Sequence, residues 1–216
     1  MAAARKPRSL TDYDVHPSVA MVEEWVAELK QKSGRTLEEW VKFIRKSGPG
    51  DEKSSREWLK NEHKQGTNTA WWLAERAFAA AGAANEETPE GYLKAAAAYV
   101  EELYAGGKSG LRPIHDALVK LGRGLGADVK VCPCKTMVPL FRNHVIGQIK
   151  PSTRTRIDFG LALGKLMGKK KFPARLIDTG GFAKKDRITH RIALGAPAEV
   201  DDFVEKWLTS AYELDA

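Results

Sequence analysis

Apolar residues recur at helical spacing through the first third of the chain. The first apolar stripe runs from Val22 to Leu29, and Gly34 predicts the end of that helix. Thr36 and Glu39 have the spacing of a capping box, in which each side chain bonds the backbone amide of the other residue. This pair predicts the start of a second short helix.

Two further helices are predicted next. Ser54 and Glu57 repeat the capping-box spacing ahead of another apolar stripe, and Gly66 predicts its end. The fourth helix contains the adjacent Trp71 and Trp72. Neighbouring positions on a helix point about 100° apart, so both indoles are buried only if the helix packs on two sides. Core packing and an exposed docking surface are both open for this pair.

The period of the apolar pattern changes in the second half. Thr88 and Pro89 suit the cap and first turn of a new helix, and another helix follows "AGGKSG". After "GRGLGA" come five segments typical of strands, "DVKVCP", "TMVPLFR", "HVIGQIK", "TRTRIDFGLAL" and "RITHRIAL", and then an amphipathic helix in "PAEVDDFVEKWLTSAYEL". The pattern predicts an α+β fold, with a small all-helical N-terminal domain followed by a domain with a mainly antiparallel sheet flanked by helices. We predict a flexible basic arm over residues 1–18, the helical domain over 19–85, and the α+β domain with a basic sheet over 86–216.

The composition is that of a folded protein. Of its 216 residues 43% are hydrophobic, and no apolar run approaches the roughly 20 residues that cross a bilayer. The basic opening "MAAARKPRSL" is not followed by the apolar segment of a secretory signal. Two cysteines one residue apart provide no disulfide framework, which favours a reducing compartment. We predict a cytoplasmic protein with no membrane partner.

Positive charge is concentrated in one segment. The formal net charge is +7, yet residues 130–191 contain 15 Lys and Arg against three Asp. Residues 1–108 contain 16 Lys and Arg against 17 Asp and Glu. Such a field favours an acidic partner, whether nucleic acid, a phosphate ligand or an acidic protein.

One strand of this segment has alternating apolar and basic positions. In "TRTRIDFGL" the apolar face contains Ile157 and Phe159, so this face is expected to be buried. Arg154 and Arg156 project from the other face, and Arg191 joins them if its strand is a neighbour. Guanidinium groups suit phosphate, because two donors reach one anion. The alternative is a solvated face, partly neutralised by the aspartate of the same strand.

A glycine-containing loop adds to the basic character. "GKLMGKKKF" lacks the glycine spacing of a phosphate-binding loop between a strand and a helix. It is interpreted as a flexible basic connection, which either contacts a polyanion or remains a solvated hinge. The predicted anion-binding residues are Arg142, Lys150, Arg154, Arg156, Lys169, Lys170, Lys171, Arg187 and Arg191.

Metal binding and catalysis have little support. Cys132 and Cys134 provide two thiolates, and a tetrahedral zinc site would need two more ligands. No spacing requires His144 and His190 to converge on them, and alternation places His190 on an apolar face, as for a hydrogen-bonded core histidine. His115 and the aspartate that follows it diverge on a helix. We predict no catalytic residues, no metal and no cofactor.

Several longer stretches resemble an uncharacterised bacterial two-domain family. "SGRTLEEWVKFIRKSG" and "SREWLKNEHKQGTNTAWWLA" resemble its helical domain of unknown function. "KTMVPLFRNHVIGQIKPSTRTRIDFGLAL", "THRIAL" and "VDDFVEKWLTSAYE" resemble its α+β partner domain. This second domain type is similar to one attached to predicted restriction-type nucleases, so the resemblance implies a nucleic-acid context but no particular site residues.

These observations favour a non-enzymatic binding module for nucleic acid or another polyanion, acting mainly through phosphate contacts. One alternative is a small anionic ligand held between sheet and helices by Arg156, Arg191 and His190. Another is an enzyme whose site residues are dispersed along the chain. A continuous basic ridge favours the first function, and a closed pocket with inward-pointing arginines favours the second.

Overall fold

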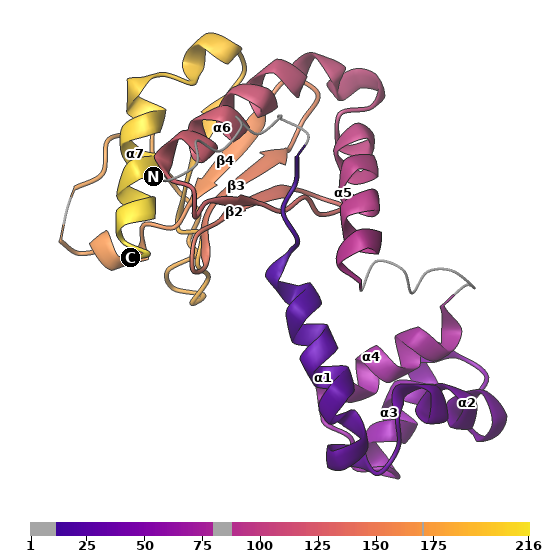
Figure 1. The fold of residues 1–216 in the computed structure, drawn as a ribbon. Coiled ribbons are helices and arrows are strands. Elements are labelled where there is room, and N and C mark those ends of the chain that lie inside the picture. The colour runs from indigo at the N-terminus through magenta and orange to yellow at the C-terminus, as the bar shows by residue number, and fades with distance from the viewer. Residues whose placement is uncertain (1–11, 80–87, 170) are drawn as a thin grey trace, which may run out of the picture. The chain divides into compact units, whose positions relative to one another are not determined.

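The computed structural model describes residues 12–79, 88–169 and 171–216. They form two compact units: Pro17–Tyr92 is helical, and residues 12–16 with Leu93–Ala216 contain a sheet (Figure 1). The predicted α+β fold class, with a helical part before the sheet, is confirmed. Within the described ranges, no helix is both long and apolar enough to span a bilayer.

The helical unit has the elements α1 (Pro17–Ser33), α2 (Leu37–Ser47), α3 (Glu52–Asn61) and α4 (Thr67–Phe78). The predicted capping box of α2 is confirmed: the Glu39 amide donates to Thr36 Oγ1 at 3.2 Å, and the Thr36 amide donates to Glu39 Oε2 at 2.8 Å. The box predicted at Ser54 and Glu57 is wrong. Asp51 caps α3 one turn earlier and accepts a hydrogen bond from the Ser54 amide at 2.9 Å.

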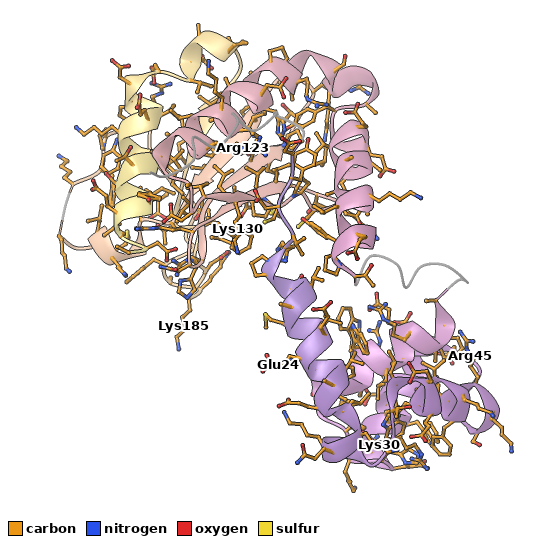
Figure 2. The ribbon with its side chains drawn as sticks, viewed as in Figure 1. Glu24, Lys30, Arg45, Arg123, Lys130 and Lys185 are labelled. Carbon is orange, nitrogen blue, oxygen red and sulfur yellow. The ribbon has the colours of Figure 1, made fainter. Side chains whose placement is uncertain are left out.

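Large aromatic side chains fill the core of the helical unit. Trp40 is almost fully buried, and its indole Nε1 donates to Ser33 Oγ at 2.7 Å. Phe43 stacks on Trp58 with ring centroids 5.4 Å apart. Arg45, labelled in Figure 2, donates from Nε to the Ala77 carbonyl at 2.7 Å and so ties α2 to α4. The other buried members of this hydrophobic cluster are Leu29, Ile44, Leu59, Ala70, Leu73, Ala74 and Ala77.

After the helical unit, the chain enters the sheet unit within α5 (Pro89–Leu103). The 3₁₀ helix η2 (Gly106–Leu111) and α6 (Arg112–Leu125) follow. Thr88 caps α5 as predicted, because its Oγ1 accepts from the Gly91 amide at 3.1 Å. The sheet has six antiparallel strands in the order β1-β2-β3-β4-β6-β5. Their bounds, with those of the remaining helices, are β1 (Lys130–Val131), β2 (Val138–Phe141), β3 (Val145–Pro151), β4 (Ile157–Leu161), η3 (Gly164–Leu166), β5 (Ile177–Asp178), β6 (His190–Leu194), η4 (Pro197–Glu199) and α7 (Asp202–Glu213).

Helices α6 and α7 lie against one face of this sheet (Figure 1), here called the helix face. The packing is close: a Cβ added to Gly147 of β3 would lie 3.3 Å from both Leu208 of α7 and Phe159 of β4. Ile157 and Leu161 of β4 are fully buried on the same face. Strand alternation sends Asp158 and Gly160 to the opposite side, here called the outer face.

The residues before α1 contact the sheet. The Asp14 amide donates to the Val131 carbonyl at 2.9 Å, and the Val131 amide donates to Asp14 Oδ2 at 2.9 Å. Helix α1 then begins at Pro17, inside the segment 1–18 that the sequence analysis assigns to an arm. Residues 1–11 of that segment lie outside the described part of the chain.

Candidate anion-binding surfaces

The outer face gathers three cations around one carboxylate. β4 and β6 are neighbours, with Gly160 paired to Arg191. Arg191 Nη1 donates to Asp158 Oδ1 at 2.6 Å, and Arg156 Nε lies 3.0 Å from the same oxygen. Lys150 of β3 stands opposite Asp158 in the antiparallel register, so their side chains share a face. These four residues, the outer-face cluster, have a formal excess of two positive charges.

The arginines of the outer-face cluster remain accessible. The side chains are 43% exposed at Arg156 and 29% exposed at Arg191, whereas that of Asp158 is 17% exposed. A guanidinium group has five N–H donors, and one carboxylate cannot satisfy two such groups. Asp158 therefore reduces the local positive charge but also orients both guanidinium groups. Each guanidinium retains N–H donors that can bind a further anion.

Arg154 does not lie on the outer face, contrary to the expectation from strand alternation. β4 begins only at Ile157, and the residues before it form the turn from β3. The Arg154 side chain packs over Gly107 of η2, where an added Cβ would lie 3.2 Å from its Cδ. Beside it is a cavity of about 490 Å³, also lined by Lys108, Lys135 and Glu102. The two lysines are not among the residues predicted from the sequence, because only the fold brings them to the β3–β4 turn.

Arg142 and Arg187 bind the C-terminal segment rather than the outer-face cluster. Arg142 Nε donates to Asp128 Oδ2 at 2.8 Å, and its Nη1 donates to the Tyr212 carbonyl at 3.0 Å. The Arg187 guanidinium pairs with the carboxylate of Asp215. Both arginines stand at the end of the sheet where β2 turns into β3. They are thus structural anchors as well as basic residues.

The predicted basic loop lies between η3 and β5. Lys169 and Lys171 are exposed there, and Lys170 is outside the described residues. The Lys169 amide donates to the Leu166 carbonyl at 3.1 Å, which continues the turn of η3. No phosphate-binding strand–loop–helix geometry arises, since the described chain passes from η3 to β5 without a helix.

Both cysteines are free thiols: Cys132 is buried and Cys134 is half-buried. Burial raises the pKa of the Cys132 thiol to about 12 and also raises the pKa of Cys134. Metals bind the thiolate, so a raised thiol pKa disfavours coordination. Among the residues that the structure describes, no three His, Cys, Asp or Glu side chains gather so that they could hold a metal ion.

His190 is a core residue of the helix face. It is 2% exposed, its Nδ1 lies 3.0 Å from Thr189 Oγ1, and its ring centroid is 4.0 Å from that of Phe172. Burial lowers the pKa of His190, which favours its neutral form. Because the next residue, Arg191, points to the outer face, the two side chains do not line one cleft. Ile188 precedes β6 and covers Gly160 on the outer face.

Trp71 and Trp72 differ in their surroundings. Trp72 is half-buried and meets Trp25 edge-on, with ring centroids 4.2 Å apart. Trp71 is 45% exposed, and the Arg56 guanidinium lies 5.7 Å from its ring centroid. Both indoles line an apolar groove of about 470 Å³ with Met21 of α1. Trp72 therefore packs within the helical unit, whereas Trp71 remains largely accessible to solvent.

The region that contains the sheet matches a known family. Residues 100–215 match the family model described as a domain of unknown function, DUF5655. The chain belongs to this family. The DUF5655 domain runs from α5 through α7 and contains the outer-face cluster, whereas Trp71 and Trp72 precede it. No curated protein and no solved structure matches the chain.

Proposed function

We propose that the DUF5655 domain is a non-enzymatic binding module for nucleic acid or another polyanion, and that the outer-face cluster contacts backbone phosphates. The proposal rests on the convergence of three cations around Asp158: Lys150 of β3, Arg156, which immediately precedes β4, and Arg191 of β6. Neighbouring strands lie about 4.8 Å apart, so such a face presents cations at intervals comparable with the spacing of phosphates along a strand.

The basic cavity at the β3–β4 turn extends this surface. Arg154 and Arg156 are two residues apart in that turn, so they link the outer-face cluster to Lys108 and Lys135. Lys108 is held in place because its Nζ donates to the Pro151 carbonyl at 2.8 Å. A ridge of cations on several elements suits an extended anion better than a compact one. The resemblance to domains attached to predicted restriction-type nucleases is consistent with nucleic acid as that anion.

We predict salt-dependent binding without base specificity, because phosphate contacts release counterions and contain no sequence information. Fluorescence anisotropy with labelled single-stranded and double-stranded DNA and with RNA, over a salt series, measures it. The double variant Arg156→Gln/Arg191→Gln should lower the affinity at least about tenfold near 50 mM salt and make the slope of log K against log salt shallower by about one to two.

The matched control is Lys30→Gln/Lys42→Gln, which removes two exposed lysines from α1 and α2 of the helical unit. It removes the same charge from the chain and should change the affinity less than about twofold, because neither lysine belongs to the outer-face cluster and only cations that contact phosphates release counterions. Absence of binding to every nucleic acid at low salt would refute the proposal. An unchanged salt slope in the arginine variant would place any binding elsewhere on the chain.

Replacing Asp158 with asparagine should strengthen polyanion binding. The change removes the only negative charge of the outer-face cluster and frees donors of Arg156 and Arg191. One unit charge at about 4 Å in water is worth about 1 kcal/mol, which corresponds to an affinity increase of about fivefold at low salt. The same anisotropy titration measures this effect. A weaker complex in a variant that remains folded would contradict a phosphate contact at this face.

A further inference from the structure

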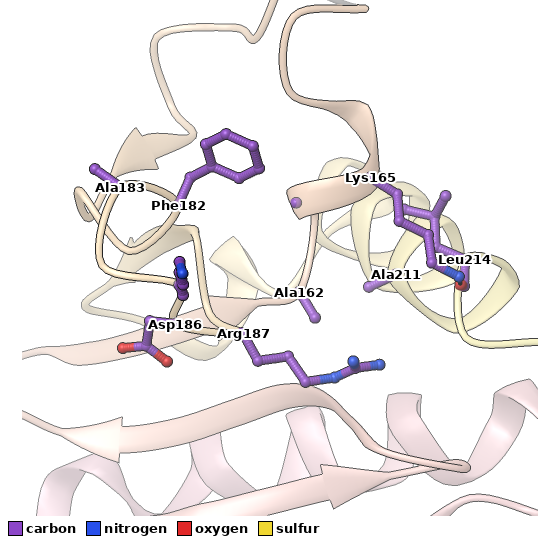
Figure 3. A pocket seen from close by; sticks show the side chains of 10 residues that line it. Ala162, Lys165, Phe182, Ala183, Asp186, Arg187, Ala211 and Leu214 are labelled. Carbon is purple, nitrogen blue, oxygen red and sulfur yellow. Dashed lines mark hydrogen bonds between the residues drawn. The ribbon is translucent and has the colours of Figure 1, made fainter.

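A second cavity opens at the other end of β4. It has a volume of about 520 Å³, which lies within the size range of small-molecule sites. Its floor is apolar and consists of Ala162, Ala211 and Leu214. Phe182 and Arg187 come from the loop between β5 and β6, Lys165 comes from η3, and the three side chains surround the space above this floor (Figure 3). The cavity shares no residue with the outer-face cluster.

One wall is an aromatic ring held by a rigid turn. Phe182 is 54% exposed, although the turn that presents it is well ordered by hydrogen bonds. The Asp186 amide donates to the Gly181 carbonyl at 2.8 Å, and the Lys185 amide donates to the Phe182 carbonyl at 3.1 Å. Only glycine fits at position 181, because a Cβ added to Gly181 would lie 2.2 Å from the Ile188 carbonyl oxygen. The backbone therefore fixes a large apolar ring at the edge of a cavity, where it is available to stack.

Two cations on the other sides are anchored at the end of α7. Lys165 donates from Nζ to the Leu214 carbonyl, and Arg187 pairs with Asp215, the next residue. Arg187 Nε also donates to the Val145 carbonyl at 2.7 Å. An ammonium group has three donors and a guanidinium group has five, so both retain donors for a ligand. Since the anchors fix their positions in advance, binding an anion costs little further ordering.

Two carboxylates near the cavity offset part of this charge, because Asp215 pairs with Arg187 and Asp186 is among the lining residues. Asp186 lines the cavity, but its carboxylate points away from the Arg187 guanidinium (Figure 3). Asp215 is 5% exposed, and its side chain accepts a hydrogen bond from the His144 amide at 2.8 Å. Its backbone carbonyl accepts a second hydrogen bond, from the side-chain amide of Asn143. Lys185, on the same loop as Phe182, extends into solvent (Figure 2) and adds to the positive field at the rim.

We propose that this cavity binds a mononucleotide, with its base stacked on Phe182 and its phosphate between Lys165 and Arg187. A planar ring suits the exposed aromatic wall. A phosphomonoester has close to two negative charges at neutral pH, which attract the ammonium groups of Lys165 and Lys185. Its oxygens accept the donors that Asp215 leaves free on the Arg187 guanidinium. The same chemistry is found in a free nucleotide and at the phosphorylated end of a nucleic-acid strand.

Isothermal titration calorimetry on the full chain tests the ligand class. Adenosine 5′-monophosphate is the probe, adenosine lacks the phosphate, and ribose 5-phosphate lacks the base. We expect the nucleotide to bind at least about tenfold more tightly than either fragment, because each fragment leaves one wall unused. A 5′-phosphorylated oligonucleotide, compared with its 5′-hydroxyl form, distinguishes a strand end from a free nucleotide: equal affinities for the two forms assign the site to the free nucleotide.

Single substitutions distinguish the contribution of the Phe182 ring from that of the cationic side chains. Phe182→Ala should weaken nucleotide binding at least about fivefold and leave ribose 5-phosphate binding unchanged, since it removes only the stacking surface. Lys165→Gln should weaken both. Lys184→Gln is the matched control, because Lys184 is an exposed residue of the same loop that does not line the cavity. It should change either affinity less than about twofold.

The result that overturns the proposal is absence of nucleotide binding, or binding that Phe182→Ala leaves unchanged in a folded protein. Arg156→Gln/Arg191→Gln distinguishes this site from the outer-face cluster. That variant should bind the nucleotide as the unaltered chain does, because its residues are not part of the cavity. Loss of nucleotide binding in that variant would show that the nucleotide binds at the outer-face cluster, and it would overturn the assignment to the cavity.

Discussion

Replacing Ile157 with alanine is expected to lower the free energy of unfolding by about 2–5 kcal/mol. Ile157 is fully buried on the helix face, pairs with Leu194 of β6 in register and belongs to the main core. Removing its side chain loses the transfer free energy of the deleted carbons and leaves a cavity that neighbouring strands cannot close. Urea denaturation followed by tryptophan fluorescence measures the effect.

The control for this change is the preceding residue. Arg156→Gln should lower the free energy of unfolding by no more than about 1 kcal/mol, because an ion pair with a partly exposed arginine contributes little. A variant of Arg156 that unfolds would show that this arginine is a structural group and would remove it from the outer-face cluster. If Ile157→Ala proved as mild as Arg156→Gln, the assignment of the two faces of β4 would be wrong.

Acid should destabilise the protein through His115 of α6. This side chain is 1% exposed, and burial, followed by the charges of Arg112 and Arg123, lowers its pKa to about 3. In the unfolded chain the pKa of His115 has its ordinary value of 6.5. Between these two pKa values the unfolded state therefore binds a proton at His115 that the folded state does not bind. This contribution to stability is complete above pH 6.5 and is lost as the pH falls from 6.5 towards 3. The slope is about 1.4 kcal/mol per pH unit.

Two variants test the role of His115. His115→Gln should remove about one proton from the pH dependence of unfolding, measured by urea melts between about pH 7 and 4. Tyr104→Phe deletes the hydroxyl that lies 3.1 Å from His115 Nδ1 but keeps the histidine buried. Since burial is the main cause of the lowered pKa, the acid sensitivity should persist in Tyr104→Phe. An unchanged slope in His115→Gln would assign the acid response to other groups, such as His16 and His190, whose pKa values burial also lowers.

Local patterns were sufficient wherever a structure depends on near neighbours in the chain. The capping box of Thr36 and Glu39 was predictable because both partners lie within one helical turn. The same rule failed at Ser54, because the Asp51 carboxylate caps the helix one turn earlier. Strand β5 was missed because it has two exposed residues and no alternating pattern.

The sequence by itself determined the α+β class, the position of most helices and strands, and which face of β4 is buried, because apolar periodicity and capping are local properties of the chain. Only the tertiary structure decided which cations meet. Lys150, Arg156 and Arg191 converge because β3, β4 and β6 are adjacent, while Arg154 turns towards η2 and Arg187 pairs with Asp215. The cavity beside Phe182 joins three segments far apart in the chain, and no local pattern encodes how distant segments pack.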